Sequence, residues 1–460
     1  MIKKSDAELI LSCALRTGGD FAEIFAEDVN AGTIQLLSSA IEGANRTHTR
    51  GAGIRIFKGT NSVYAYTNDL SLEGMLKTAK EAAAALGQAQ ETGKPVVLYN
   101  ALAKNIHVIG RSVTDIEGKK KAALLHMADA AARAQSGEIV QVQSLMMDNL
   151  QNVLIANTEG LFVRDTRAYT RFMVSAIAAN GAENQSGTRS PGAHAGYEFI
   201  ESLNVEELAK QAATSAVTML HAKPCPAGVM PVVIENGFGG VIFHEACGHA
   251  LEATSVAKDC SVFCGKLGQK IAADCVTAAD DGTIPNAWGS TNIDDEGTPA
   301  QRKVLIENGV LKGYMIDRLG SRRMGMPMTG SGRRQDYTFA PTSRMTNTFI
   351  CNGNDDNEAM IATMGDGLYA ASLGGGSVNP ITGEFNFAVN EGYLVKDGKI
   401  TEPVRGATLI GKGSEVLMKI DRVGTNLERA QGMCGSMSGS VRTDVGQPRL
   451  RVSSMTVGGR

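Results

Sequence analysis

Apolar and polar residues alternate along the first half of the chain in patterns that predict both helices and strands. The first segment is amphipathic, and Ser5 followed three residues later by Glu8 is typical of a capping box. Helices are predicted over residues 5–17, 72–89, 117–134 and 205–220. Strands are predicted over residues 21–27 and 33–37, in a hairpin over 51–66 that turns at 58–61, and repeatedly between 137 and 180. This half therefore predicts a sheet accompanied by helices.

The pattern changes after residues 223–228, where two prolines and one glycine interrupt both helix and sheet. Beyond them glycine becomes frequent and helical patterns become scarce. Short strands are predicted over residues 302–311, 391–400 and 407–410. Asn308-Gly309 and Asp397-Gly398 are strong hairpin signals. We therefore expect an α+β protein, with an α/β-sheet domain at residues 1–223 and a β-rich domain with one prominent helix at residues 224–460.

That helix carries a His-Glu-x-x-x-His pattern, His244-Glu245-Ala246-Cys247-Gly248-His249, after a buried strand at 232–234. Zinc peptidases often carry His-Glu-x-x-His, where histidines four apart diverge by about 40° and share one ion. Histidines five apart diverge by about 140° in a regular α-helix, too far for Zn–N bonds of about 2.0 to 2.1 Å. The pattern therefore predicts either an ordinary helix without a metal or a π-bulge that restores a shared face. Gly248 would tolerate that distortion.

A third metal ligand has to come from elsewhere in the chain, because a catalytic zinc usually takes three protein ligands and a water. Glu252 is one candidate, three residues after His249. Cys434 is another, in a stretch rich in glycine and serine that we expect to form a flexible loop. Three further cysteines make no complete four-ligand site and are interpreted as buried thiols, namely Cys260, Cys264 and Cys275.

Composition excludes several classes of function. The 460 residues carry a formal net charge of −3 and no basic tail, which weighs against nucleic-acid binding as the main task. No segment approaches the roughly 20 apolar residues of a membrane span, and the first residues lack the apolar stretch of a signal peptide. The eight cysteines are scattered and do not form a dense disulfide framework. We therefore expect a cytoplasmic protein without a membrane or nucleic-acid partner.

Other residues of the second half are candidates for substrate contact. Arg333, Arg334 and Tyr337 could donate hydrogen bonds to a developing oxyanion, or they could be structural ion pairs and a core tyrosine. The glycine run at 374–376 lacks the lysine and hydroxyl of a phosphate-binding loop, and it favours a close backbone approach. Trp288, the single tryptophan, receives no assignment.

Further motifs follow in order along the second half. They are DDEG at 294–297, VLIENGVLKGYMIDRLGSRRMG at 304–325, GRRQ at 332–335, APTSRMTNT at 340–348, GGG at 374–376 and a closing stretch from Cys434 to Gly459. Together with HEACGH at 244–249 they resemble the TldD branch of the TldD/PmbA family of bacterial metallopeptidases. The first half resembles that family more loosely, mainly over residues 51–68.

The resemblance implies that His244, His249 and Cys434 bind zinc. It also implies a cytoplasmic assembly of two subunits, a homodimer or a heterodimer with a PmbA-type paralogue, that encloses the active site and admits only unfolded peptides. The PmbA branch lacks the metal motif, so its presence implies the catalytic branch. We therefore expect a zinc-dependent peptidase whose metal-binding helix supplies Glu245 as the catalytic base. The alternative is a non-catalytic regulatory or binding subunit of a larger complex.

Overall fold

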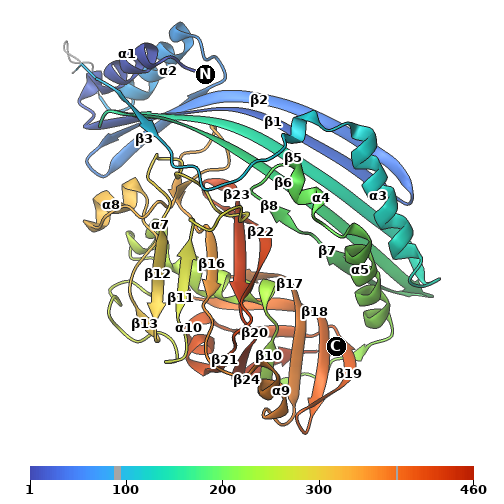
Figure 1. Ribbon diagram of the computed structural model, residues 1–460. Coiled ribbons are helices and arrows are strands. Elements are labelled where there is room, and N and C mark those ends of the chain that lie inside the picture. The colour runs from blue at the N-terminus through green and yellow to red at the C-terminus, as the bar shows by residue number, and fades with distance from the viewer. Residues whose placement is uncertain (88–94, 380–381, 460) are drawn as a thin grey trace.

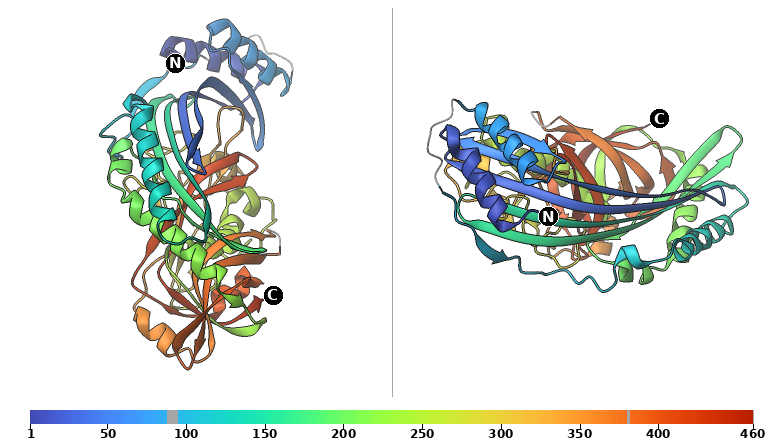
Figure 2. Two further views of the ribbon diagram at one scale, coloured as in Figure 1. Left: turned by 90° about the vertical axis from the view of Figure 1, so that its right-hand side faces the viewer. Right: turned by 90° about the horizontal axis from the view of Figure 1, so that it is seen from above.

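Three large β-sheets organise the protein (Figure 1). The computed structural model describes residues 1–87, 95–379 and 382–459. One eight-stranded sheet comes from the first half of the chain and arches over two sheets from the second half (Figures 1 and 2). This arrangement confirms the expected α+β fold class. Among the described residues, no helix combines the length and the apolar character needed to cross a membrane.

Long antiparallel strands make up the arching sheet. Its central strands are β1 (Phe21–Leu37), β2 (Ala40–Lys58), β5 (Ile139–Asn157) and β6 (Leu161–Asn180). Shorter strands complete it, namely β3 (Asn61–Thr67), β4 (Tyr99–Leu102), β7 (Glu183–Arg189) and β8 (Gly192–Ala193). The segments 21–27 and 33–37, predicted as separate strands, belong to the single strand β1.

Helices cover one face of the arching sheet. They are α1 (Lys4–Ala14), α2 (Leu72–Ala84), α3 (Gly118–Arg133), α4 (Tyr197–Glu201) and α5 (Val205–Leu220), with 3₁₀ turns η1 (Leu15–Thr17) and η2 (Val113–Asp115). Helices α1 and α2 pack near Ile24, and α3 and α5 pack near Ile34 on the same face of β1. Phe25 on the opposite face packs against Ile293 of the second half. This contact explains why residues 21–27 are buried on both faces, whereas the rest of β1 is half-buried on one face.

The second half contains two further sheets and short helices. The eight-stranded sheet consists of β9 (Lys223–Pro224), β10 (Gly228–Ile234), β17 (Gly367–Val378), β18 (Glu384–Lys396), β19 (Lys399–Arg405), β20 (Thr408–Lys412), β21 (Ile420–Val423) and β24 (Leu450–Gly458). The six-stranded sheet consists of β11 (Ala278–Asp281), β12 (Arg302–Glu307), β13 (Val310–Leu311), β16 (Asn347–Ile350), β22 (Glu428–Ser436) and β23 (Gly439–Gln447). The remaining elements are β14 (Gly332–Arg333), β15 (Thr342–Ser343), α8 (Arg318–Met324), α9 (Asn357–Ala362), α10 (Gly413–Val416) and η6 (Leu417–Lys419).

A helical segment lies in the core that these two sheets share. It runs through η3 (Gly237–Gly240), α6 (Val241–Phe243), η4 (His244–Gly248), η5 (His249–Leu251) and α7 (Ala253–Val256). One buried cluster joins Phe243 and Leu251 of this segment to Val232 of one sheet and Ile350 of the other. The segment that carries the histidines is therefore held on both sides by apolar packing.

Several local predictions meet different outcomes. Asn308-Gly309 and Asp397-Gly398 do turn between paired strands, with positive φ at both residues of each turn. The capping box at Ser5 is wrong, because α1 begins at Lys4 and the Ser5 hydroxyl donates to Asp6 instead. The helix predicted over 72–89 ends at Ala84, and residues 88–89 lie outside the described residues. The domain division at residue 223 stays a prediction.

Buried ion pairs join the arching sheet to the second half. Arg55 of β2 donates from Nη1 to Oε1 of Glu296 at 2.6 Å, and both side chains are almost completely buried. Arg167 of β6 donates from Nη1 to Oδ1 of Asp295 at 2.7 Å. Burial raises the pKa of Glu296 well above its ordinary value, and the Arg55 guanidinium opposes that rise. These two pairs fix the DDEG motif against two long strands of the sheet.

Replacing Arg55 with methionine is expected to destabilise the protein strongly, because it leaves the Glu296 carboxylate buried without its cationic partner. The free energy of unfolding should fall by about 3 to 5 kcal/mol, measured by denaturant unfolding. Arg46→Met on the same strand is the control, since Arg46 is half-exposed in its pair with Asp148 and should cost about 0 to 1 kcal/mol. Equal decreases in the free energy of unfolding of the two variants would show that the buried Arg55 pair stabilises the protein no more than the Arg46 pair does.

Candidate metal centre

The histidine segment contains a π turn, as the spacing of its two imidazoles predicted. Residues His244–Gly248 form the π turn, and the His249 N–H donates to the His244 carbonyl five residues earlier. The chain then passes through one 3₁₀ turn and becomes extended at Glu252, with ψ of 133°. The regular α-helix that would place the two rings on different faces is therefore not formed.

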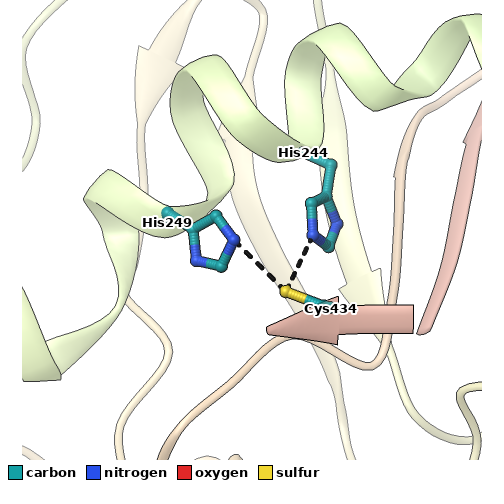
Figure 3. Close-up of side chains that lie close together, drawn as sticks. All are labelled: His244, His249 and Cys434. Carbon is teal, nitrogen blue, oxygen red and sulfur yellow. Dashed lines mark hydrogen bonds between the residues drawn. The ribbon is translucent and has the colours of Figure 1, made fainter. Parts of the chain in front are cut away.

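Three donor atoms converge beneath this turn (Figure 3). His244 Nε2 lies 3.3 Å from the Cys434 sulfur, and His249 Nε2 lies 3.2 Å from it. The ligand atoms of all three residues lie within 4.8 Å of one another. The rings are nearly perpendicular, at 85°, so both point a nitrogen toward the sulfur without stacking. The structure thus brings together the two motif histidines and a cysteine about 190 residues away.

Cys434 lies on a strand, and the expectation of a flexible loop is wrong. It belongs to β22 and pairs with Val441 of β23, close to the turn that joins the two strands. The Cys434 carbonyl accepts a hydrogen bond from Nη2 of Arg344. Pairing with β23 thus outweighs the weak strand preference of the neighbouring glycines. The cysteine is therefore held in place before any metal binds.

The electrostatics of the group favour a thiolate. Burial alone would raise the pKa of Cys434, but His244 and His249 outweigh burial and lower it to about 4. Burial disfavours a charged His249 ring as well, yet Glu252 and Cys434 together raise the pKa of that ring well above its ordinary value. At neutral pH the sulfur is consequently in the form that binds metals.

The two nearby glutamates occupy different sides of His249. An Oε2 atom of Glu245 lies 3.7 Å from His249 Nε2, the nitrogen that faces Cys434, and its side chain is partly exposed. Glu252 Oε2 lies 3.2 Å from Nδ1, the opposite ring nitrogen, and its side chain is buried. Glu252, the competing candidate for third ligand, therefore stands behind His249 and outside the group of three donors.

Two glycines allow the π turn to pack closely. A side chain at Gly240 would meet the backbone of Gly446 at 2.4 Å, and one at Gly248 would meet the Met345 sulfur at 2.3 Å. The φ of Gly248 is −54°, which any residue adopts. Glycine was expected at position 248 because it tolerates a distorted backbone. The structure indicates instead that glycine is needed there because a side chain would overlap Met345.

The candidate oxyanion donors make structural contacts. Arg333 donates to the carbonyl of Met345 at 2.6 Å, and Arg334 donates to the carbonyl of Asp295 at 2.9 Å and stacks on Phe25. The ring of Tyr337 packs against the backbone of Gly51, where any side chain would overlap it. These contacts favour the structural alternative for Arg333 and Arg334 over an oxyanion role.

Other sequence predictions about cysteines and glycines need correction. Cys260 and Cys275 are exposed and Cys264 is half-buried, so the interpretation as buried thiols is wrong for the first two. Their sulfurs donate to the carbonyls of Lys258, Val256 and Ile420, and none of them belongs to the group of converging metal donors found among the described residues. The glycine run at 374–376 does allow a close backbone approach, but the approach is to Asn386 of the neighbouring strand β18.

The roles of two residues near the site could not be predicted from the sequence. Trp288 donates its indole N–H to the carbonyl of Gly432 at 2.9 Å, which ties β22 to the loop after β11. Arg344 holds the carbonyl of Cys434. Arg344 lies inside the APTSRMTNT motif, so the motif was a signal for it, whereas Trp288 carried no signal beyond being the single tryptophan.

A mixed α and β protein in which two imidazoles and a thiolate converge on a π turn carries the donor set of a metal site. Residues 227–459 match the PmbA/TldA metallopeptidase C-terminal domain, residues 111–220 the central domain and residues 22–86 domain 1. The chain belongs to this PmbA/TldD family of metallopeptidases, as its motifs suggested.

Several relatives are similar over nearly their whole length. A metalloprotease TldD homolog of Haemophilus influenzae is 35% identical over 457 residues, with 96% of this chain and 93% of the relative covered. One of Buchnera aphidicola from Acyrthosiphon pisum is 35% identical, with 92% and 89% covered. A metalloprotease of Methanothermobacter thermautotrophicus is 30% identical, with 96% of each covered. These names support a protease function.

Solved structures share the fold. TldE from Thermococcus kodakarensis has a TM-score of 0.75 and 20% identity, over 99% of this chain and 100% of that one. A Thermotoga maritima protein, described as a candidate modulator of a DNA gyrase, has a TM-score of 0.81 and 23% identity, over 99% of each chain. At these identities the likeness concerns the fold alone.

Replacing Gly248 with alanine is expected to disturb the π turn, because the new methyl group would overlap the Met345 sulfur. Such overpacking typically costs about 1 to 3 kcal/mol of unfolding free energy, which thermal or denaturant unfolding would measure. Gly375→Ala is the control, since a methyl group there meets nothing within 4 Å. Met345→Ala is itself expected to destabilise the protein, because Met345 is completely buried, but Gly248→Ala should cost less in that background. An equal cost of Gly248→Ala in both backgrounds would point away from the overlap.

Proposed function

We propose that this chain is a zinc-dependent peptidase that cuts unfolded peptides. The observation that carries the proposal is the convergence of His244, His249 and Cys434. Glu245 lies beside His249 Nε2, the ring nitrogen that faces Cys434. A set of three protein ligands leaves a fourth position for water, as catalytic zinc sites do.

The three donors fit a zinc ion. Zn–N bonds of about 2.0 to 2.1 Å and a Zn–S bond of about 2.3 Å, at tetrahedral angles, place neighbouring donors roughly 3.5 Å apart. The observed nitrogen-to-sulfur distances of 3.3 and 3.2 Å are slightly shorter. A small outward movement would accommodate the ion. Two imidazoles and one thiolate are also ligands that zinc prefers.

Glu245 is the proposed catalytic base. When bound, zinc would lower the pKa of a water toward about 7 and polarise the scissile carbonyl. Glu245 would accept the proton of that water and pass it to the leaving amine. Its carboxylate is partly exposed and lies 3.7 Å from His249 Nε2, so it can reach a group bound between the donors and the solvent. No side chain forms a covalent bond to the substrate in this scheme.

Assembly and location complete the proposal. We propose a cytoplasmic pair of subunits, either a homodimer or a heterodimer with a PmbA-type paralogue, that encloses the site and excludes folded proteins. The fold shared with TldE from Thermococcus kodakarensis supports a paralogue of this shape as a candidate partner. The alternative, a non-catalytic regulatory subunit, requires no convergence of metal-binding side chains. The converging donors therefore favour the enzyme.

The purified protein should contain about one zinc per chain, and Cys434→Ser should lose most of it together with peptidase activity. Elemental analysis after dialysis measures the metal. Cys247→Ala is the matched control, because Cys247 is buried inside the same π turn but is not one of the three converging donors. A Cys434→Ser protein that keeps its zinc and still cuts peptides would remove Cys434 from the site.

Glu245→Gln should keep the zinc and lose about 10²- to 10⁴-fold of the turnover, because an amide cannot accept the proton of water at neutral pH. The assay is cleavage of a reduced, unfolded polypeptide, with the same polypeptide in its folded form as the test of the enclosed site. Loss of zinc together with activity would make Glu245 a structural residue. Cleavage of the folded form would argue against the chamber.

A further inference from the structure

We propose that Glu252 and Arg344 form a buried bracket that positions His249 and Cys434 for the metal. The two residues are positioning residues, since neither belongs to the three converging donors. The inference rests on the proposed metal centre and extends it by naming what holds the ligands in place. Each half of the bracket contacts a different ligand, and the two halves contact each other.

Glu252 fixes the ring of His249. Its Oε2 accepts from His249 Nδ1 at 3.2 Å, which leaves Nε2 free to face Cys434. A carboxylate behind a ligating histidine orients the ring, selects its tautomer and makes it a stronger ligand. The backbone at Glu252 is fixed as well, because it forms a bridge with Met315 and Ala253 donates to the Met315 carbonyl at 2.8 Å.

Arg344 fixes the hairpin that carries Cys434. Its Nη2 donates to the carbonyl of Cys434 on β22, and its Nη1 donates to the carbonyl of Gly439 on β23 at 2.8 Å and to the hydroxyl of Ser438 at 3.0 Å. The guanidinium thus grips both strands on either side of the turn. Its side chain is completely buried.

The two halves meet through their charges. Arg344 Nε lies 3.9 Å from Glu252 Oε1, with both side chains out of contact with solvent. Within the described part of the chain neither of these atoms has a hydrogen-bond partner. A buried charge without a counter-charge is costly, so the two opposite charges stabilise each other in place. This ion pair therefore joins the helical segment that carries His249 to the strand that carries Cys434.

The bracket acts on only one of the histidines. His244 Nδ1 is buried, and among the described residues it has no partner comparable to Glu252. His244 is instead held by the packing of the π turn. The geometry consequently makes zinc affinity depend on Glu252 and Arg344 jointly, through His249 and Cys434.

The test is the zinc affinity of the full-length protein, measured by competition with a chelator. Glu252→Gln and Arg344→Gln should each still bind one zinc at saturation, but with an affinity about 10- to 100-fold weaker. The double variant should bind more tightly than the product of the two single effects would give, because both changes break one unit. Cobalt substitution supplies a second readout, since a displaced thiolate alters the sulfur-to-cobalt charge-transfer band.

Arg451→Gln is the matched control, because Arg451 is another buried arginine of the same half, paired with Asp421 and hydrogen-bonded to Thr363. It should lower stability without changing zinc affinity or the cobalt spectrum. If Arg344→Gln fails to fold, Arg344→Lys keeps the charge but cannot grip both strands, and it should weaken zinc binding in the same direction. The bracket would be refuted, without affecting the proposed metal centre, by unchanged zinc affinity in the folded Glu252 and Arg344 variants. It would also be refuted if the double variant lost affinity by the full product of the two single effects. A parent protein that binds no zinc would overturn the metal centre and the bracket with it.

Discussion

The structure around the site depends on one geometric constraint, the need to bring two imidazoles that are five residues apart to one face of a helix. The π turn at His244–Gly248 meets that constraint, and it widens the helix inside a packed core. A widened turn needs space, and the absent side chains at Gly240 and Gly248 provide it against Gly446 and Met345. The two sheets of the second half then clamp the turn from both sides.

The same region connects the candidate site to the arching sheet. Gln335 donates its N–H to the carbonyl of Ser438 and accepts from the N–H of Ser440, so it holds the turn of the hairpin that carries Cys434. Its neighbour Arg334 contacts Glu23 and the hydroxyl of Tyr64 on the arching sheet. Residues 333–337 therefore make sense as a connection between the two halves of the chain. Arg333, Arg334 and Tyr337 were candidates for an oxyanion role only because their side chains can donate hydrogen bonds.

Sequence reasoning succeeded where local rules decide the outcome and failed where distant contacts do. The π turn could be predicted because the spacing of His244 and His249 allows few alternatives, and the Asn308-Gly309 turn because its φ values favour those residues. Composition suggested a loop at Cys434, but pairing with β23 makes it a strand. The exposure of Cys260 and Cys275 likewise depends on the folded surface. Glu252 was predicted as a candidate ligand, but it lies behind the ring because the 3₁₀ turn ends at this residue, which no local rule indicates.

The split origin of the ligands has a consequence for the folding of the site. Two ligands come from a core turn and the third from an edge strand, so a bound ion would connect elements that are far apart along the chain. Metal binding contributes to folding only to the extent that the site is unformed beforehand. Here Arg344 already ties β22 to β23, Trp288 already ties β22 to the loop after β11, and the lowered pKa of Cys434 already supplies the thiolate. Little of the free energy of metal binding is therefore needed to form the site, and most of it contributes to the affinity for the ion. Such a preformed site can keep its fourth position available to water and substrate.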